Sequence, residues 1–405
     1  MENFAEELMM PVLSFGSPVT TLLFKLERMR GMALSGSTPR EWFFQLKDSF
    51  QLFEAIGSSR IEGNNTTVLD YVTKDELPPE MKMREGFAEI GNLEKALQFI
   101  EDSTAPIDES FICELQKMAV EGLTREGDDN AGAYRDTPIR IAGASHEPPE
   151  ADSVPSFMRE LVKFIQKDCE QQYDLLKVCV VHHQLVWIHP CRNGNGRTAR
   201  LLTYAMIVRL FGVRQSRLFN PTAVFCSDRN RYYEMLKIAD SGNNDAKIQW
   251  CQFVLQGLLD ELTKAEKLTN VNYVKDFILK PVLQDALRKG QITKDESAAL
   301  HIALETPVFQ ASDLSSIWTD AFARSRNVRK LLNAGLIAPI KEGARKYYLK
   351  FTNGPLMVSL MFVMSNQRFL PESMLKNTKP CTASKAGAPP CNLFKNPDDS
   401  IFKRL

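Results

Sequence analysis

Apolar residues recur at helical spacing through most of the chain, and short polar breaks separate these segments. This pattern predicts a mainly α-helical protein. The strongest stripe lies in 39–61, where Pro39 suits a first helical turn and Gly63 suits a stop. Its apolar positions are Trp42, Phe43, Leu46, Phe50, Phe53 and Ile56. Further helices are expected at 21–32, 92–100, 110–122, 154–167, 175–188, 201–211, 228–236 and 245–262.

Two regions depart from this pattern. Between 131 and 149 the residues Ile139-Arg140-Ile141 alternate between apolar and polar, with glycine and proline on either side. Such alternation predicts a small β-hairpin. A lone hairpin is a marginal core element, so we expect it to offer an edge on which another chain docks.

The second departure begins near residue 281. Helices are expected at 291–306, from Gln310 onward with Ser312 or Asp313 as its cap, and at 321–334, followed by a hairpin with a basic glycine tip at 341–345. This order predicts a winged helix. Such modules bind DNA in many proteins and only dock proteins or dimerise in others. A short basic helix is usually a solvated face.

Composition limits the number of domains, the class of partner and the cellular compartment. A chain of 405 residues is long enough for two or three domains, and its 50 basic and 50 acidic residues cancel, so only a local patch could attract nucleic acid. Eight cysteines without CxxC pairs indicate a reducing compartment. The acidic N-terminus lacks the basic region of a secretory signal, and the run 356–364 is too short to span a bilayer. We therefore expect a cytoplasmic protein with no membrane segment.

The stretch from His189 to Arg200 lies between two apolar segments that read as buried helices. Gly194, Asn195 and Gly196 at the mouth of a helix would present backbone N–H groups to an anion. Arg197 and Arg200 lie one turn apart, so both guanidinium groups could converge on one polyphosphate.

His189 has two interpretations. A His-Pro pair can simply end a buried helix, but an imidazole beside an anion loop can also accept a hydroxyl proton near neutral pH. The loop lacks the Gly-Lys-Ser/Thr ending of a P-loop, and His182, His183 and His189 lack the spacing of a zinc hydrolase. The pattern favours transfer of a phosphorus group to a hydroxyl.

This loop closely resembles the signature HxFx(D/E)GNGRxxR of the Fic family. The segment 131–149 resembles the family's flap, Tyr232-Tyr233 stands where the family places an adenine-contacting aromatic, and Trp250 matches its late tryptophan. The resemblance covers about residues 40–260. It implies a Fic-type helical bundle with a small β-hairpin flap, followed by a winged helix. The implied divisions are an N-terminal helical region with an inhibitory helix at 1–83, a Fic core at 84–265, a linker helix and winged helix at 266–350, and a tail at 351–405 that is irregular from about 366.

The resemblance also implies an activity, the transfer of AMP from ATP to a Ser, Thr or Tyr hydroxyl of a protein, with Mg²⁺ or Mn²⁺. The protein substrate would dock on 131–149, and self-modification is expected. In this reading His189 is the base, Gly194, Asn195 and Gly196 cradle the phosphates, and Arg197 and Arg200 hold the distal phosphates. Ser58-x-x-x-Glu62-Gly63 matches the family's inhibitory motif (S/T)xxxE(G/N), whose glutamate is expected to pair with Arg200.

Two departures from the signature bear on activity. Cys191 replaces the usual Phe that pins the loop, and Asn193 replaces the acidic residue that ligates the metal. An amide oxygen can ligate Mg²⁺ but brings no negative charge. Two alternatives therefore remain open. One is a nucleotide-sensing regulator that binds DNA through 310–350 with little catalysis, and the other is removal of AMP, with Glu62 orienting water. A homodimer is a further possibility.

Overall fold

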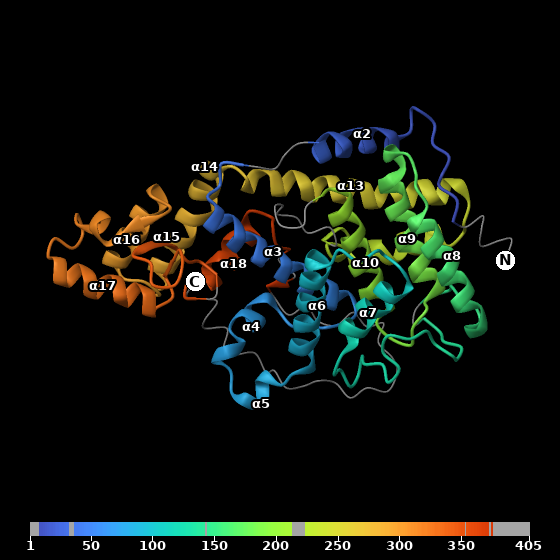
Figure 1. The fold of residues 1–405 in the computed structure, drawn as a ribbon, viewed down its shortest axis with the longest axis horizontal. Coiled ribbons are helices and arrows are strands. Elements are labelled where there is room, and N and C mark those ends of the chain that lie inside the picture. The colour runs from blue at the N-terminus through green and yellow to red at the C-terminus, as the bar shows by residue number, and fades with distance from the viewer. Residues whose placement is uncertain are drawn as a thin grey trace.

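The computed structural model describes residues 8–31, 36–141, 144–212, 223–352, 354–371 and 374–375. As expected, the described chain is mainly helical, with a helical body and a smaller unit formed by later residues at one end (Figure 1). The α-helices are α2 (Pro18–Gly31), α3 (Arg40–Ile61), α4 (Val68–Val72), α5 (Pro79–Lys82), α6 (Glu85–Asp102), α7 (Glu109–Val120), α8 (Val154–Gln166), α9 (Asp174–Ile188), α10 (Asn195–Leu210), α11 (Ala223–Cys226), α12 (Arg229–Ala239), α13 (Asn244–Leu268), α14 (Val271–Tyr273), α15 (Lys280–Arg288), α16 (Lys294–Glu305), α17 (Ala321–Asn333) and α18 (Met357–Asn366). Shorter turns are η1 (Lys74–Glu76), η2 (Ala151–Ser153), η3 (Gln171–Tyr173), η5 (Ala311–Leu314) and the π-helical η4 (Val274–Leu279).

The centre of the body is the pair α9 and α10, which pack against each other. Nearly every residue of both helices is buried. A helix that is buried on all sides must be surrounded by other parts of the protein. Here α7, α6 and α3 contact α10, while α8 and α13 contact α9. The connection from 189 to 194 is therefore held inside the body by both helices.

Helix α3 spans the junction between the body and the smaller unit (Figure 1). Near its start, the buried Gln45 donates to the backbone oxygen of Leu349 at 2.9 Å and accepts from the backbone N–H of Phe351 at 2.8 Å. Farther along, Phe50 lies edge-on to Phe369 with ring centroids 6.0 Å apart. The helix that carries the predicted inhibitory motif is thus anchored to residues from the C-terminal part of the chain.

The smaller unit contains α16, η5, α17 and a three-stranded antiparallel sheet. Its strands β1 (Phe309–Gln310), β2 (Ile337–Pro339) and β3 (Lys346–Leu349) lie in the order β1-β3-β2. Phe309 pairs with Tyr347, and Ile337 pairs with Leu349. Strands β2 and β3 form where the hairpin was expected. The helix expected from Gln310 is only the short turn η5.

The expected hairpin flap differs from the structure. Residues 131–141 and 144–149 contain turns and irregular backbone but no β-strand. Side-chain bonds to other elements satisfy much of this segment in place of cross-strand pairing. Arg135 Nε, for example, donates to the backbone oxygen of His189 at 2.9 Å, and the Gln116 side chain accepts from the Gly132 N–H at 2.6 Å. The alternating pattern near Ile139 was too short to impose a strand pair by itself.

Residues 357–366, assigned to the tail from the sequence, form the buried helix α18, which contacts α15, η4 and α4. Residues 376–405 and the break at 219–221 lie outside the described residues. In the part of the chain that the structure describes, no helix has both the length and the apolar character needed to cross a bilayer.

Candidate functional site

The loop between α9 and α10 has a shape set by its own residues. His189 ends α9 in the left-handed region, with φ 51° and ψ 60°, and Gly194 precedes α10 with φ 79°. A methyl group on Gly194 would lie 2.7 Å from Val120 Cγ1, so glycine is required there for space as well as for φ. Asn195 closes the loop, because its side chain accepts from the Cys191 N–H at 2.8 Å and donates to the Cys191 oxygen at 2.7 Å.

The imidazole of His189 is poised as a neutral base. Its Nδ1 lies 3.1 Å from the Val186 oxygen, so in the neutral ring Nδ1–H donates and Nε2 keeps its lone pair. Burial lowers the pKa of His189 to about 4, with smaller lowering effects from Arg135 and His146 against raising effects from Val186 and Glu62. At neutral pH the ring is therefore uncharged and able to accept a proton.

The structure brings Glu62 and Ser58 to Arg200, as the motif predicted. Arg200 Nη2 donates to Glu62 Oε1 at 2.7 Å and to the Ser58 backbone oxygen at 3.0 Å, and its Nε donates to Ser58 Oγ at 2.8 Å. Burial alone would raise the pKa of Glu62, but Arg200, Arg197 and Arg229 together hold it below its ordinary value. The carboxylate is thus ionised at neutral pH.

Glu62 also lies directly over the first turn of α10. A methyl group on Gly196 would be 2.2 Å from Glu62 Oε1. The first backbone N–H groups of a helix are unpaired within the helix and attract anions. The carboxylate therefore occupies the space at the helix start where the sequence predicted a phosphate.

Arg197 has a different placement from the one expected. Its side chain is 1% exposed and donates to Glu89 Oε1 at 3.0 Å and to the Glu126 backbone oxygen at 3.1 Å. These bonds tie α10 to α6 and to the loop after α7. Arg197 and Arg200 are one turn apart but point to different carboxylates, so in this structure they do not converge on one point.

The two tyrosines of α12 also occupy different environments. Tyr232 is buried, and its hydroxyl lies 2.9 Å from Nε2 of His182, a residue that sequence reasoning did not assign. Tyr233 is 42% exposed, and its hydroxyl donates to the Ile61 oxygen at 3.2 Å. The guanidinium of Arg229 lies 5.3 Å from the Tyr233 ring centre. Of the pair, Tyr233 is the side chain that a ligand can reach.

Asn193 is the candidate metal ligand of the loop. Its side-chain amide donates to the Gly127 oxygen, and its backbone oxygen accepts from Gln116 Nε2 at 3.0 Å. The same Gln116 nitrogen lies 3.1 Å from Asp128 Oδ2. Among the described residues, no three His, Cys, Asp or Glu side chains gather as a metal-binding group. Asn193 therefore offers a divalent cation one neutral amide oxygen and no negative charge.

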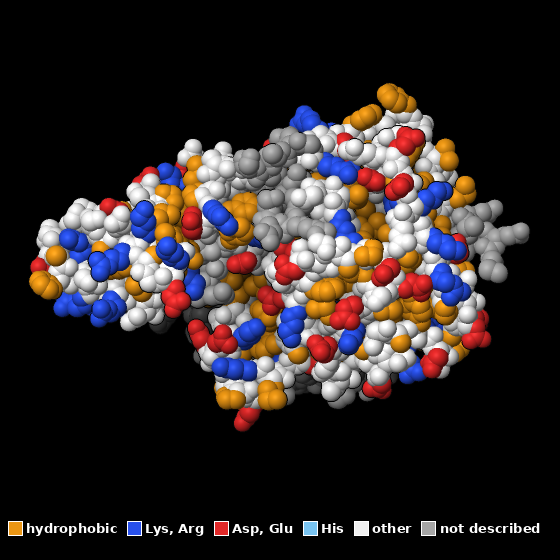
Figure 2. All heavy atoms as spheres, viewed as in Figure 1, with side chains coloured by type: hydrophobic (Ala, Val, Ile, Leu, Met, Phe, Trp, Pro, Cys, Tyr) orange, Lys and Arg blue, Asp and Glu red, His pale blue; other side chains and the backbone are white. Residues whose placement is uncertain are grey.

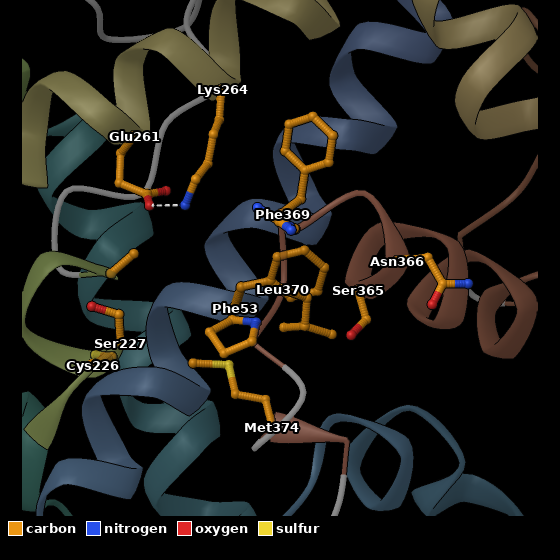
Figure 3. Close-up of a pocket in the computed structure, with 13 residues that line it drawn as sticks. Phe53, Cys226, Ser227, Glu261, Lys264, Ser365, Asn366, Phe369, Leu370 and Met374 are labelled. Carbon is orange, nitrogen blue, oxygen red and sulfur yellow. Dashed lines mark hydrogen bonds and ion pairs between the residues drawn. The ribbon is translucent and has the colours of Figure 1, made fainter.

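A separate cavity of about 370 Å³ lies between α3, α13 and the residues after α18. Phe53, Leu370 and Met374 project toward it, and the ion pair of Glu261 and Lys264 lies at one side (Figure 3). None of the described residues that line it belongs to 189–200. The cavity is therefore distinct from the His189 loop.

Known proteins similar to this chain belong to the family that the loop resembles. Residues 106–207, which contain α7 to most of α10, match the Fic/DOC family. The chain therefore contains a Fic domain. Over 192 residues it is 29% identical to a protein named protein adenylyltransferase Fic from Nematostella vectensis, covering 46% of this chain and 42% of the relative. A protein of the same name from Drosophila grimshawi is 25% identical over 209 residues, covering 50% and 39%.

The matched region is less than half of the length of these curated relatives. A solved Fic family protein from Desulfovibrio desulfuricans G20 has a similar fold, with a TM-score of 0.51 and 22% identity over 84% of this chain and 98% of that chain. At this identity the likeness supports the Fic-type helical fold.

Proposed function

We propose that this protein is an adenylyltransferase that transfers AMP from ATP to a Ser, Thr or Tyr hydroxyl of a protein, and that Glu62 holds it in an inhibited state. The observation that carries the proposal is the position of the Glu62 carboxylate. It pairs with Arg200 at 2.7 Å and covers Gly196, at the helix start beside the neutral base His189. The names of the matched relatives supply the reaction class.

In this proposal each residue has a defined task. His189 Nε2 takes the proton from the attacking hydroxyl, whose oxygen bonds to the α-phosphorus while the bond to the departing pyrophosphate breaks. The backbone N–H groups from Gly194 to Gly196 face phosphate oxygens, and Arg200 exchanges Glu62 for a distal phosphate. A bound Mg²⁺ or Mn²⁺ would neutralise phosphate charge, with the Asn193 amide oxygen as the ligand that the loop can offer.

The roles proposed for the other site residues follow from how exposed each side chain is and from what it contacts. Tyr233 and the adjacent Arg229 contact the adenine, while the buried Tyr232 supports them from beneath. Arg197 acts through Glu89 by holding α10 in place. Helix α3 is the inhibitory helix, and the segment 131–149 receives the protein substrate. Among its described residues, 131–141 and 144–149, the segment forms no β-strand, and a docking peptide would bond to its backbone there.

Radiolabel on the α-phosphate of ATP tests the reaction. We expect self-labelling to be weak in the wild type, strong in Glu62→Gly, and lost in Glu62→Gly/His189→Ala. The reaction is run with Mg²⁺ and with Mn²⁺, because Asn193 lacks the usual charge. Absence of label in every variant with both metals would falsify the proposal. Label that chases to free AMP only when Glu62 is present would instead indicate the reverse reaction.

A second candidate function concerns the smaller unit. We propose that α16, α17 and the β1-β3-β2 sheet form a winged helix that binds DNA. Lys and Arg side chains gather on this unit (Figure 2), and those exposed on α17 and on the turn and strand after it are Arg326, Arg329, Lys330, Lys341, Arg345 and Lys346. Binding to duplex DNA should weaken steeply with salt and should fall in Arg326→Ala/Arg329→Ala. Unchanged salt-dependent binding in that variant would reject this surface as the DNA-binding site.

A further inference from the structure

We propose that Arg135 is a positioning residue that holds His189 in its left-handed conformation and ties the segment 131–149 to that base. The inference rests on the proposed function of His189. It concerns a residue of the segment 131–149 that has no assigned role in the reaction. Its basis is a set of hydrogen bonds from one buried guanidinium to backbone oxygens on both sides of the site.

The first part of the argument is the end of α9. The last carbonyl groups of a helix lack partners within the helix, and a non-glycine residue in the left-handed region costs about 1 kcal/mol. Arg135 both pairs with these carbonyl groups and holds His189 in its left-handed conformation. Its Nε donates to the His189 oxygen at 2.9 Å, and its backbone N–H donates to the Pro190 oxygen at 2.8 Å. Arg135 Nη2 also lies 3.5 Å from the Ile188 oxygen. The backbone oxygens of three successive residues, 188 to 190, therefore accept hydrogen bonds from Arg135.

The second part is what the same guanidinium does on its other side. Nη1 donates to the Thr137 oxygen at 3.3 Å, and Nη2 donates to the Pro149 oxygen at 2.5 Å. Thr137 and Pro149 mark the two limbs of the segment that would receive the protein substrate. His146, between them, lies 2.8 Å from the Trp187 oxygen through Nε2, which adds a contact to α9. The Arg135 guanidinium thus bonds both the docking segment and the backbone of His189.

The third part is the absence of an ordinary ion-pair role. Arg135 is 2% exposed, and among the ion pairs between described residues none includes it. A buried cation that bonds only carbonyl oxygens gains little from simple charge pairing, so its geometry is the feature to explain. The planar fork of Arg can reach several oxygens in fixed directions, which the single ammonium of Lys cannot do. The positive charge also helps to lower the pKa of His189, after the larger effect of burial.

These contacts give a direct link from substrate docking to catalysis. A peptide that moves the limbs near Thr137 or Pro149 would pull on the guanidinium that sets the His189 backbone. Misplacement of a base by about 1 Å can cost about 100-fold in rate. Arg135 thereby makes the position of the base depend on the position of the docking segment.

The activity test uses the Glu62→Gly protein as parent and self-labelling with α-labelled ATP. We expect Arg135→Gln and Arg135→Lys each to lower the rate at saturating ATP by at least about tenfold, with the ATP concentration for half-maximal rate changed less than about twofold. Arg159→Gln, which removes an exposed arginine of α8, is the matched control and should keep the parent rate. Full activity of Arg135→Lys would overturn the positioning role, because Lys retains the charge and loses the fork. A joint change in rate, ATP half-saturation and melting temperature would overturn it as well.

A second measurement does not depend on activity. Proton titration of the His189 ring by NMR, assigned with His189→Ala, is compared between the wild type, Arg135→Gln and Arg135→Lys. The groups that face this ring are Glu62 from α3 together with Arg135 and His146 from the docking segment. Loss of the nearby cation and of the fixed backbone should raise the His189 pKa from about 4 toward the ordinary value near 6.5. An unchanged titration in Arg135→Lys, which keeps the charge and loses the fork, would refute the inference even if the adenylyltransferase reaction were established, and a raised His189 pKa in that variant would support it even if no label were found.

Discussion

The Glu62 carboxylate lies 2.7 Å from Arg200 Nη2 and fills the space above Gly196, so one side chain blocks both an arginine and a helix start. Arg200 is buried, and Ser58 supplies two further bonds from the same helix turn. An anionic ligand that needs this arginine must displace Glu62. The inhibition that we propose is thus a competition between a built-in carboxylate and a phosphate for one cation.

Gly196 offers a test of this close contact. In the wild type we expect Gly196→Ala to destabilise the protein, because the new methyl group would lie 2.2 Å from Glu62 Oε1. In Glu62→Gly the same substitution should be neutral or stabilising by up to about 1 kcal/mol, since alanine favours a helix over glycine. Urea unfolding of the four proteins measures the coupling, which we expect to be about 1–3 kcal/mol. Equal effects in both backgrounds would mean that Glu62 does not occupy this space.

Competition with nucleotide gives a second prediction. Saturating ATP with Mg²⁺ should raise the melting temperature of Glu62→Gly more than that of the wild type, because at a given concentration a ligand stabilises the folded state more when it binds more tightly. Thermal shift across an ATP titration measures the difference. Glu160→Gln, which removes an exposed carboxylate of α8, serves as the control and should behave as the wild type. Identical shifts in all three proteins would contradict competition by Glu62.

The pH dependence of the rate follows from His189. A base with a pKa of about 4 remains deprotonated throughout the mildly acidic range, so its rate is lost only as pH falls through that value. Glu62 raises the His189 pKa, so its removal in Glu62→Gly moves the acid limb further down. We therefore expect label incorporation by Glu62→Gly to stay nearly constant from about pH 8 to about pH 5. A limb near the ordinary imidazole value of about 6.5 would show that the base is exposed to water.

The Glu62–Arg200 pair has its own pH dependence. The pKa of Glu62 is lowered in the folded protein, so the stability that this pair contributes is present above the ordinary carboxyl pKa and is lost as pH falls through the folded value. The stability difference between wild type and Glu62→Gly should accordingly shrink below about pH 4. Urea unfolding at several pH values measures it. A difference independent of pH would contradict an ionised pair.

The anchor of α3 can be tested through Gln45. Gln45→Ala removes the side-chain partner of the Leu349 oxygen and of the Phe351 N–H in a buried site. Each group left unpaired should lower the free energy of unfolding by about 1–3 kcal/mol. Chemical denaturation is the measurement. Gln256→Ala, at an exposed site on α13, is the control and should change stability by less than about 0.5 kcal/mol. A loss no greater than that of the control would show that the anchor is weak.

Local patterns were sufficient where the physical cause is itself local. The apolar stripes predicted α3, α9 and α10, since a helix must bury such a stripe. Gly194 and Gly196 indicated a loop that needs bare backbone, and the motif from Ser58 to Glu62 predicted the pair with Arg200 that the structure contains. The stripes and the loop spacing are local, whereas the Glu62–Arg200 pair joins residues 138 apart and was expected only from the resemblance of 58–63 to the inhibitory motif.

Tertiary packing decided the features that depend on residues distant in sequence. Arg197 bonds Glu89 from α6 although it stands one turn from Arg200, because the direction of a long side chain follows the nearest buried carboxylate. Segment 131–149 bonds α7 and the end of α9 in place of pairing with itself, and Arg135 acquires its place at His189 only through that packing. The sequence alone therefore determined the helices and the chemistry of the loop. The folded structure decided which charged groups meet there, because long-range burial selects partners that no local spacing encodes.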